Sequence, residues 1–301
     1  MIDGIINVYK EQDYTSFDVV AKLRGILKQK KIGHTGTLDP MAEGVLLVCL
    51  GKATKLVDLL TEGDKCYRAT MQLGFETDTE DVTGEKTAEG DVSVLKNLTE
   101  SQVKDAILSF VGKYDQIPPM YSAIKKDGKK LYEYARAGIE IKREARTVEI
   151  YDICDIKKES DDIYSFDVHC SKGTYIRSLC RDIGRKLSCY AVLSGLLRKE
   201  VHGFSVDDAV KLCDIEKRQT EGTLQEIVLP VDALLQMYPA YEITEQAKNY
   251  LKNGNKLSPR MFQNMGTRRE KRIRVYDAGN FVALYDYMDT EQKYKPFKMF
   301  L

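Results

Sequence analysis

Residues 33–40, GHTGTLDP, form a short polar stretch in which a histidine, two threonines and an aspartate stand among glycines and a proline. Pro40 disfavours helical backbone at the residue before it, so Asp39 should be extended and firmly held. A carboxylate held on a loop in this way can act as a nucleophile or in acid–base chemistry. Asp-Pro also occurs in ordinary turns, and a lone His34 suits hydrogen bonding better than general-base chemistry. The loop by itself therefore leaves a catalytic and a structural Asp39 both open.

Two other segments carry side chains that suit chemistry at a carboxylate. Tyr175 and Arg177 are separated by one residue, so on extended backbone both side chains would point the same way. A buried arginine beside Asp39 would favour its ionised form and lower its pKa. Tyr67 lies on an otherwise apolar face of the strand expected at 65–74, with Ala69, Met71 and Leu73, so core packing is the simpler interpretation. A packed tyrosine and a surface arginine remain the alternatives for Tyr175 and Arg177.

The signatures of common nucleotide and metal enzymes are missing from the sequence. A P-loop at 44–54 fails, because six residues separate Gly44 from Gly51 where four are needed, and Ala53 replaces the Ser or Thr that holds the metal. There is no GxGxxG after a strand, no GxSxG and no HExxH. The three histidines are scattered and no two of the seven cysteines form a CxxC. We expect neither a metal nor an organic cofactor, which leaves carboxylate chemistry as the enzymatic option.

The compartment expected for this chain is the cytoplasm. No apolar run reaches the roughly 18 residues of a transmembrane helix. The first residues, MIDGIINVYKEQDYTS, lack the basic start and apolar stretch of a signal peptide. An odd number of cysteines without a regular spacing argues against a disulfide framework and fits a reducing environment.

Charge is balanced overall but unevenly distributed. The chain has 46 basic and 46 acidic residues, yet residues 76–91 hold seven acids and one lysine. Residues 125–146 hold eight basic residues against four acids, and RREKRIR at 268–274 is a second basic run. Segregation of this kind can give a neutral protein a basic, nucleic-acid-binding surface. Runs of charge that are simply solvated are the alternative.

The expected elements follow one another without regular strand–helix alternation, which favours the α+β class. Thr15 and Ser16 can cap a helix that runs to about residue 29. Residues 45–50 are typical of a strand buried on both faces. The remaining pattern predicts strands at 65–74, 147–156 and 163–170, helices at 99–111 and after residue 175, and a loop at 76–92. Residues 114–146 are expected to form an irregular lobe with one short helix near 130–137.

The last 60 residues or so have the pattern of a separate module. Two prolines in LPVDALLQMYPAYEIT indicate a boundary near 230–240. A short helix is expected at 244–251, and the runs RIRVYD and FVALYDY, separated by AGN, predict a hairpin. One short helix with several strands suits a small β-barrel.

Four segments in the same order resemble motifs of the TruB-type tRNA pseudouridine synthases. They are GHTGTLDPMAEGVLLVCLGKATK (33–55), KCYRATMQLGFETDTEDVTG (65–84), QIPPMYSAIKKDGKKLYEYARAG (116–138) and CSKGTYIRSLCRDIG (170–184). The resemblance implies the pseudouridine synthase fold, a mixed, largely antiparallel sheet with helices, in a catalytic domain at 1–235. It also implies an RNA-gripping lobe at about 115–146 and a C-terminal β-barrel of the PUA type, an RNA-binding module, at 240–301.

The activity that the resemblance implies is isomerisation of uridine 55 in the T-loop of tRNA to pseudouridine. The target base must leave its stack, and the rearrangement needs no cofactor. By motif match Asp39 is the nucleophile, acting on the base or on the sugar, and Arg177 pairs with it. Tyr67 stacks on the flipped base and moves a proton. The residues expected to bind the substrate are His34, Tyr175, Leu196, Lys125, Lys129, Lys130 and Arg136.

Two positions depart from the family pattern, and two other functions remain as alternatives. Val192 stands where the family has a histidine, and Leu197 stands where it has an arginine. One alternative is a guide-RNA-dependent pseudouridine synthase subunit, which shares the Asp loop. The other is an RNA-binding or tRNA-folding module with incidental catalysis. For the stand-alone enzyme we expect a monomer with tRNA as its partner and no obligatory protein partner.

Overall fold

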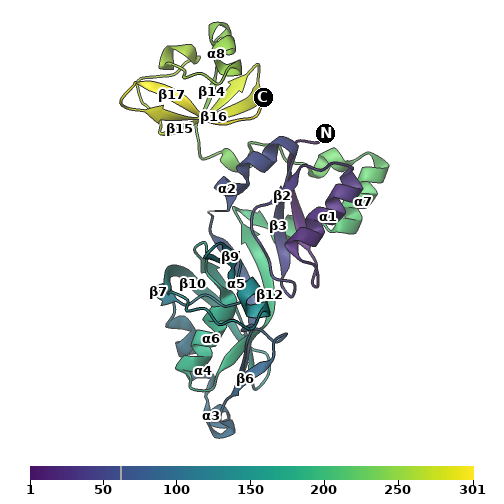
Figure 1. Cartoon of the computed structure of the whole chain (residues 1–301), viewed down its shortest axis with the longest axis vertical. Coiled ribbons are helices and arrows are strands. Elements are labelled where there is room, and N and C mark those ends of the chain that lie inside the picture. Colours follow the sequence, from purple (N-terminus) through teal and green to yellow (C-terminus); the bar gives the residue numbers. More distant parts are fainter. Residues whose placement is uncertain (62) are drawn as a thin grey trace.

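The computed structural model describes residues 1–61 and 63–301. Figure 1 shows an elongated molecule, with a large sheet through its middle and one end and a smaller sheet at the other end. The chain starts in the large sheet and finishes in the small one. No helix in these residues is long and apolar enough to cross a membrane.

The large sheet has nine strands, and their pairing is antiparallel except between β3 and β12. Its path is β1 (Gly4–Lys10), β3 (Glu43–Leu50), β12 (Ala191–Val201), β4 (Lys65–Leu73), β11 (Ile163–Cys170), β10 (Arg146–Lys158) and β7 (Gly112–Gln116). Two short strands lie off this path, β2 (Ile32–His34) against β3 and β13 (Phe204–Ser205) against β12. The mixed, largely antiparallel sheet predicted from the sequence is confirmed.

Strands β3 and β4 bring the chemistry-bearing segments to the centre of this sheet. All residues of β3 after Glu43 are buried, as expected for a strand covered on both faces. In β4 burial alternates, with Tyr67, Ala69, Met71 and Leu73 on the buried face. Strand β12, which the sequence analysis left unassigned, lies between β3 and β4.

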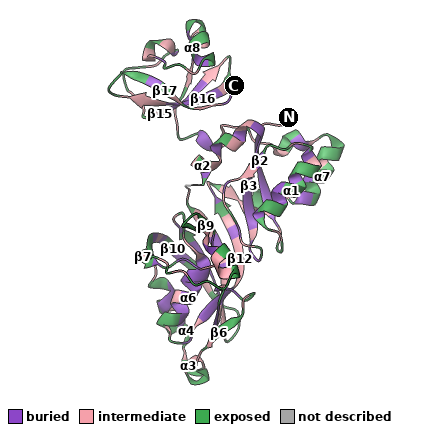
Figure 2. Ribbon diagram, viewed as in Figure 1, coloured by how far each residue is buried: buried purple, intermediate pink, exposed green. Residues whose placement is uncertain are grey.

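Helices cover the faces of the large sheet. Helix α1 (Ser16–Leu27) begins at a capping box formed by Thr15 and Asp18, which confirms the predicted cap. Figure 2 shows that α1 turns a buried side inward and an exposed side to solvent. The other helices of this part are α2 (Val57–Leu60), α3 (Val92–Asn97), α4 (Glu100–Leu108), α6 (Ile176–Lys186) and α7 (Leu212–Glu221). Single 3-10 turns lie at Gly51–Leu56, Val206–Asp208, Leu224–Ile227 and Ala233–Leu235.

The acidic segment after β4 is not the simple loop predicted for 76–92. It forms a hairpin of β5 (Phe75–Thr77) and β6 (Lys86–Glu89), and it buries Glu76, Glu80 and Asp81. The lobe expected at 114–146 contains the hairpin of β8 (Lys125–Lys126) and β9 (Lys129–Lys130) and the helix α5 (Leu131–Arg136). The short helix predicted there is confirmed.

The C-terminal residues form an open, four-stranded sheet. Its order is β14 (Ala240–Glu242), β15 (Arg272–Asp277), β16 (Asn280–Met288) and β17 (Lys293–Met299), with α8 (Lys248–Lys252) and 3-10 turns at Glu245–Ala247 and Pro259–Met261. The β15–β16 hairpin predicted from AGN is present, but the described residues show no closed barrel. Leu284 and Phe300 join a hydrophobic cluster with Ile5 and Leu47 of the large sheet.

Candidate functional site

A cavity of about 600 Å³ opens where the 33–40 loop, the start of α1, strands β4 and β12, the start of α6 and the lobe meet. Seven of the side chains that the sequence analysis placed in one site line this cavity together, although His34 and Leu196 are more than 160 residues apart in the sequence. They are His34, Asp39, Tyr67, Lys130, Tyr175, Arg177 and Leu196.

The loop that carries Asp39 is fixed through its backbone. The Leu38 amide donates to Ser16 Oγ at 2.9 Å, and the Asp13 amide donates to the Pro40 carbonyl at 2.9 Å. The Lys10 ammonium, which is buried, donates to the Pro40 and Ala42 carbonyls. Burial lowers the Lys10 pKa to about 8. Asp39 is therefore held firmly, as its position before proline suggested.

Arg177 forms the ion pair with Asp39 that the resemblance implied. Its Nε lies 2.9 Å from Asp39 Oδ2, while Nη1 and Nη2 donate to the carbonyls of Thr79 and Tyr121 at 2.8 and 2.9 Å. The Asp39 side chain keeps 36% of its surface exposed, and that of Arg177 only 5%. Arginine thus fixes one face of the carboxylate and leaves the rest accessible from the cavity.

The pKa of Asp39 differs from the expectation drawn from Arg177 alone. Burial raises it, Arg177 opposes the rise, and the nearby Asp81 carboxylate adds to it. Asp81 Oδ2 lies 3.8 Å from Arg177 Nη1. Arg177 lowers the pKa of Asp39, as expected, but the net pKa is raised because desolvation outweighs the ion pair.

Tyr67 lies across from Arg198, since their Cα atoms are paired between β4 and β12. The tyrosine is buried in the wall of the cavity, and burial raises the pKa of its hydroxyl while Arg198 opposes the rise. The phenol is therefore protonated at neutral pH. Tyr67 belongs both to the core and to the cavity, so the packing and functional interpretations of this residue are compatible.

Two family models match the chain one after the other. The N-terminal domain of the TruB family of pseudouridylate synthases matches residues 24–176. The chain belongs to this family. The C-terminal domain of tRNA pseudouridylate synthase B matches residues 177–236. The pseudouridine synthase fold predicted from the sequence follows from this membership.

Relatives of this TruB-family chain match over nearly its whole length. The tRNA pseudouridine synthase B of Clostridium perfringens (strain 13 / Type A) is 45% identical over 284 residues, 94% of each chain. The protein of that name from Lachnoclostridium phytofermentans (strain ATCC 700394 / DSM 18823 / ISDg) is 47% identical over an alignment that covers both chains completely. A chain in the crystal structure of a Cbf5–Nop10–Gar1 complex is 27% identical with a TM-score of 0.73, covering 99% of this chain and 85% of that one.

Tyr175 and Arg177 both line the cavity of this TruB-family chain, but the backbone that places them there differs from the extended one predicted. Tyr175 is the extended residue before α6, and Arg177 already lies in the helix. Gln116 holds the turn, accepting from the Tyr175 amide at 2.8 Å and donating to its carbonyl at 3.0 Å. Both side chains face the cavity, so the predicted convergence is right although the backbone is not extended through Arg177.

His34 and Leu196 also line the cavity. His34 ends β2, and burial lowers the pKa of its imidazole, so the ring is neutral at neutral pH. Leu196 lies on β12, paired in register with Ala69 of β4. Of the two departures, Val192 is fully buried in the core, and Leu197 lies next to the cavity residues Leu196 and Arg198.

The lobe cations named from the sequence do not share one position. Lys130 lines the cavity, and its ammonium lies over the Tyr132 ring at 5.4 Å, as does the guanidinium of Arg136 at 5.3 Å. Lys125 and Lys129 lie on the exposed β8–β9 hairpin, away from the cavity wall. Of these four cations of the lobe, Lys130 is the one that lines the cavity.

Arg198 is the main site residue that sequence reasoning missed. It is fully buried, and it donates to the Val45 carbonyl at 2.7 Å and the Gly36 carbonyl at 3.4 Å, on either side of Asp39. Gly44 makes this approach feasible: its φ is 103°, and a Cβ there would lie 2.3 Å from the Arg198 carbonyl oxygen. A charged residue inside the apolar run AVLSGLLR was the available signal.

A buried charge network under the lobe was also missed. Glu80 pairs with Arg181 and accepts from Ser178 Oγ at 2.5 Å, while Arg143 of the lobe lies 3.8 Å away. Arg181 also donates to the Ile117 carbonyl at 3.0 Å. The acidic run at 76–91 was interpreted as a charge cluster, but several of its acids bind α6 arginines.

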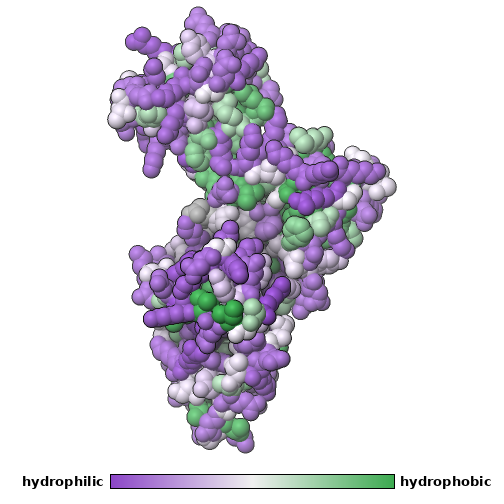
Figure 3. Space-filling model, in the orientation of Figure 1, coloured by the Kyte–Doolittle hydropathy of each residue, from purple (hydrophilic) through white to green (hydrophobic). Residues whose placement is uncertain are grey.

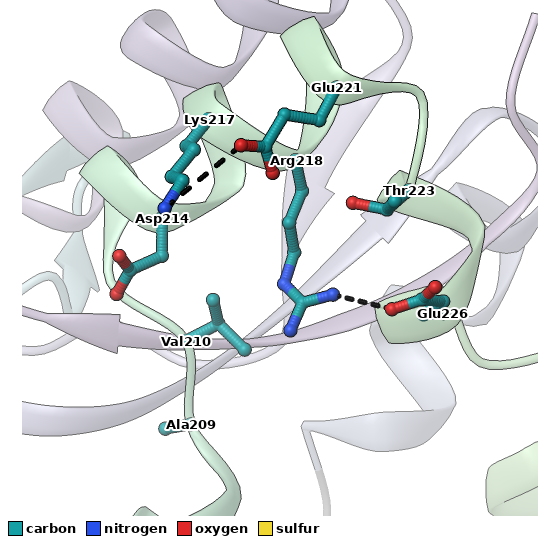
Figure 4. Close-up of a pocket in the computed structure, with 8 residues that line it drawn as sticks. All are labelled: Ala209, Val210, Asp214, Lys217, Arg218, Glu221, Thr223 and Glu226. Carbon is teal, nitrogen blue, oxygen red and sulfur yellow. Dashed lines mark hydrogen bonds and ion pairs between the residues drawn. The ribbon is translucent and has the colours of Figure 1, made fainter.

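A second depression on the surface offers a contrast. It is lined by Ala209, Val210, Asp214, Lys217, Arg218, Glu221, Thr223 and Glu226 (Figure 4). Its charges pair with each other, Arg218 with Glu226 at 2.8 Å and Lys217 with Glu221 at 4.0 Å (Figure 4). Neither this depression nor any other part of the described chain gathers three His, Cys, Asp or Glu side chains in a metal-binding arrangement.

Proposed function

We propose that this protein isomerises a uridine of tRNA to pseudouridine, at position 55 in the T-loop. The main support for this proposal is the accessible Asp39 carboxylate, which Arg177 holds at 2.9 Å in a cavity that Tyr67 also lines. Two relatives that match over 94% or more of their length are both named tRNA pseudouridine synthase B. A TruB-family chain with this site has the parts that the reaction requires.

The reaction is a rearrangement without a net change in atoms or electrons. The N1–C1′ glycosidic bond breaks, the base turns within the cavity, and a C5–C1′ bond forms. The proton on C5 is then removed, and N1, which no longer bonds to the sugar, gains a proton. Asp39 acts as the nucleophile, forming a bond to the base or to the sugar carbon that breaks again before the product leaves.

Arg177 and Tyr67 support this chemistry in different ways. The guanidinium of Arg177 orients Asp39 and favours its ionised form against the cost of burial. Tyr67 provides a ring for the flipped base and a hydroxyl that can exchange a proton with it. The Arg198 side chain, on the neighbouring strand, interacts with that hydroxyl and would keep it in a defined position.

Base flipping explains the remaining cavity residues. The uridine must leave its stack to reach Asp39, which costs a few kcal/mol. We assign His34 to the space the base vacates, where a neutral imidazole can stack without a charge. Tyr175 and Leu196 would hold the flipped base from either side of the cavity.

The lobe and the C-terminal sheet would contact the parts of the RNA that lie outside the cavity. The exposed Lys125, Lys129 and Arg136, together with Lys130, suit phosphate contacts. We assign residues 1–235 to the catalytic domain, with the lobe at about 115–146, and residues 240–301 to a PUA-like RNA-binding module. The protein would work in the cytoplasm as a monomer, with tRNA as its partner.

The guide-RNA-dependent alternative has one observation in its favour, the TM-score of 0.73 to a chain of a Cbf5–Nop10–Gar1 complex. That chain is longer, since the match covers 85% of it, whereas the tRNA pseudouridine synthases B match end to end at 41–47% identity. The tRNA enzyme is therefore the better-supported function.

Incubating the purified protein with an unmodified T-arm hairpin, without metal, nucleotide or guide RNA, tests the proposal. Pseudouridine should form at the T-loop uridine. Asp39→Asn should bind the hairpin but lose at least about 10⁴-fold in turnover, because the nucleophile is gone. Tyr67→Phe should retain binding and lose about 100-fold in turnover, because only the hydroxyl is removed.

Matched controls separate chemistry from folding. Tyr67→Leu removes ring and hydroxyl, so it should bind RNA more weakly than Tyr67→Phe. Asp214→Asn, in the depression of Figure 4, should behave as the unmodified protein. Appreciable turnover by Asp39→Asn would refute the assignment, and conversion that needs a guide RNA would favour the alternative.

A further inference from the structure

Phe17 is the most exposed aromatic side chain in residues 1–61 and 63–301, with 63% of its surface accessible. Single exposed apolar side chains are ordinary, and Figure 3 shows small hydrophobic patches scattered over a largely hydrophilic face. The location of Phe17 is what distinguishes it. Among the large hydrophobic side chains exposed in the described chain, it alone lines the cavity that contains Asp39.

The position of Phe17 relative to Asp39 is fixed by the first turn of α1. Thr15 accepts from the Asp18 amide at 3.1 Å, and Asp18 accepts from the Thr15 amide at 2.8 Å. The residue between Thr15 and Phe17 is Ser16, whose hydroxyl accepts from the Leu38 amide beside Asp39. The same turn therefore holds the catalytic loop and presents the phenylalanine.

The surroundings of Phe17 are those of a stacking surface and not of a packing contact. The guanidinium of Arg24 lies over the ring at 5.8 Å, and most of the remaining ring surface is exposed to solvent. Tyr132, which also lines the cavity, has cations at its ring as well. Aromatic rings with adjacent cations are how proteins bind unpaired nucleobases, because ring and base stack while the cation meets the phosphates.

We propose that Phe17 stacks on an unpaired base of the RNA loop that adjoins the uridine entering the cavity. The inference rests on the proposed function and adds a second nucleobase site to it. The ligand is a nucleobase of any identity, because every base offers a π face. Phe17 takes no part in the bond rearrangement, and it contributes affinity and the orientation of the loop.

A tryptophan reporter tests this directly, because the chain contains no tryptophan. Phe17→Trp is made in the Asp39→Asn background, so that bound RNA stays unconverted. Titration with the T-arm hairpin should quench the emission saturably, since the indole would stack on a base. Val92→Trp in the same background is the matched control. Val92 is 61% exposed on α3, at the far end of the molecule (Figure 1), and its emission should not change.

Kinetics provide the second measurement. Phe17→Ala should raise the KM for the hairpin about tenfold and change kcat less than about threefold, because the stacking of one base is removed. Phe17→Tyr should keep the KM within about twofold, since it keeps the ring. Val92→Ala should match the unmodified protein.

The outcomes of these experiments distinguish a failure of the stacking site from a failure of the proposed pseudouridine synthase activity. Quenching at Phe17→Trp with a raised KM for Phe17→Ala supports the stacking site. Pseudouridine formation by the unmodified protein, with an unchanged Phe17→Trp emission or an unchanged KM for Phe17→Ala, overturns the stacking site alone. If the unmodified protein neither binds nor converts the hairpin, the proposed function fails and the inference fails with it.

Discussion

Positively charged side chains have different roles in the cavity around Asp39 and in the lobe that forms one of its walls. In the cavity, Arg177 and Arg198 are buried and donate to fixed carbonyl oxygens. In the lobe, Lys125, Lys129 and Arg136 are exposed to solvent. A buried guanidinium with several fixed partners determines geometry, whereas an exposed cation acts through a field that salt screens. Loss of the first should reduce turnover, and loss of the second should reduce affinity.

The largest effect in this comparison is expected for Arg198→Met. Its side chain holds the Gly36 and Val45 carbonyls on either side of Asp39 and faces Tyr67 across the sheet. Without these hydrogen bonds the 33–40 loop should shift, and a displacement of about 1 Å can cost about 100-fold in rate. We expect kcat to fall about 100-fold while the KM for the T-arm hairpin stays within about threefold.

Arg274 is the matched control for a buried arginine. It donates to the Tyr238 carbonyl at 2.8 Å and to Asp232 at 3.2 Å, in the C-terminal part of the chain. Arg274→Met should lower the melting temperature as Arg198→Met does, since both leave buried acceptors unpaired. Only Arg198→Met should lower kcat in the fraction that remains folded. Equal kcat values for the two variants would reduce Arg198 to a structural role.

An intermediate effect, visible in the pH dependence, is expected for Asp81→Asn. The Asp81 carboxylate raises the pKa of Asp39, so removing that charge should lower the pKa and keep Asp39 ionised to more acidic pH. The acid limb of kcat/KM should therefore move to lower pH. At neutral pH, activity should fall no more than about tenfold, the cost of one weakened interaction with Arg177.

Glu89→Gln removes the same charge from the same hairpin, at an exposed residue that pairs with Lys86 at 3.1 Å. Its pH profile should coincide with that of the unmodified protein. If both variants move the acid limb equally, the effect is one of net charge, and the distinction between fixed and screened charges fails at this point.

Local patterns predicted several elements well because neighbouring residues determine them. The cap at Thr15, the alternation in β4 and the β15–β16 hairpin are examples. Resemblance, rather than local physics, brought Asp39, Tyr67 and Arg177 together. The structure then placed all three in one cavity.

Long-range packing explains what the sequence did not reveal. Arg198 is recognisable as a site residue only once β12 lies between β3 and β4, and those pairings join residues more than 100 positions apart. Glu80 looked like part of a solvated acidic run until α6 supplied Arg181. The net pKa of Asp39 depends on how deeply the cavity buries it, which no spacing of residues expresses.

The smallest effect is expected in the lobe, for the double variant Lys125→Gln with Lys129→Gln. Both ammonium groups are exposed on the β8–β9 hairpin, where they can release counterions from RNA phosphates. We expect the KM to rise about three- to tenfold at about 0.1 M salt with kcat unchanged. The slope of log KM against log salt should fall by about 0.7 to 0.9 for each phosphate that the lobe no longer neutralises.

Two controls accompany the lobe variant. Lys96→Gln, which replaces an exposed lysine of α3, should change neither the KM nor the slope. Arg198→Met should leave the slope as it is, because a fully buried guanidinium meets no counterions. An unchanged slope for the lobe variant, or a changed one for Arg198→Met, would contradict the division between charges that fix geometry and charges that attract RNA.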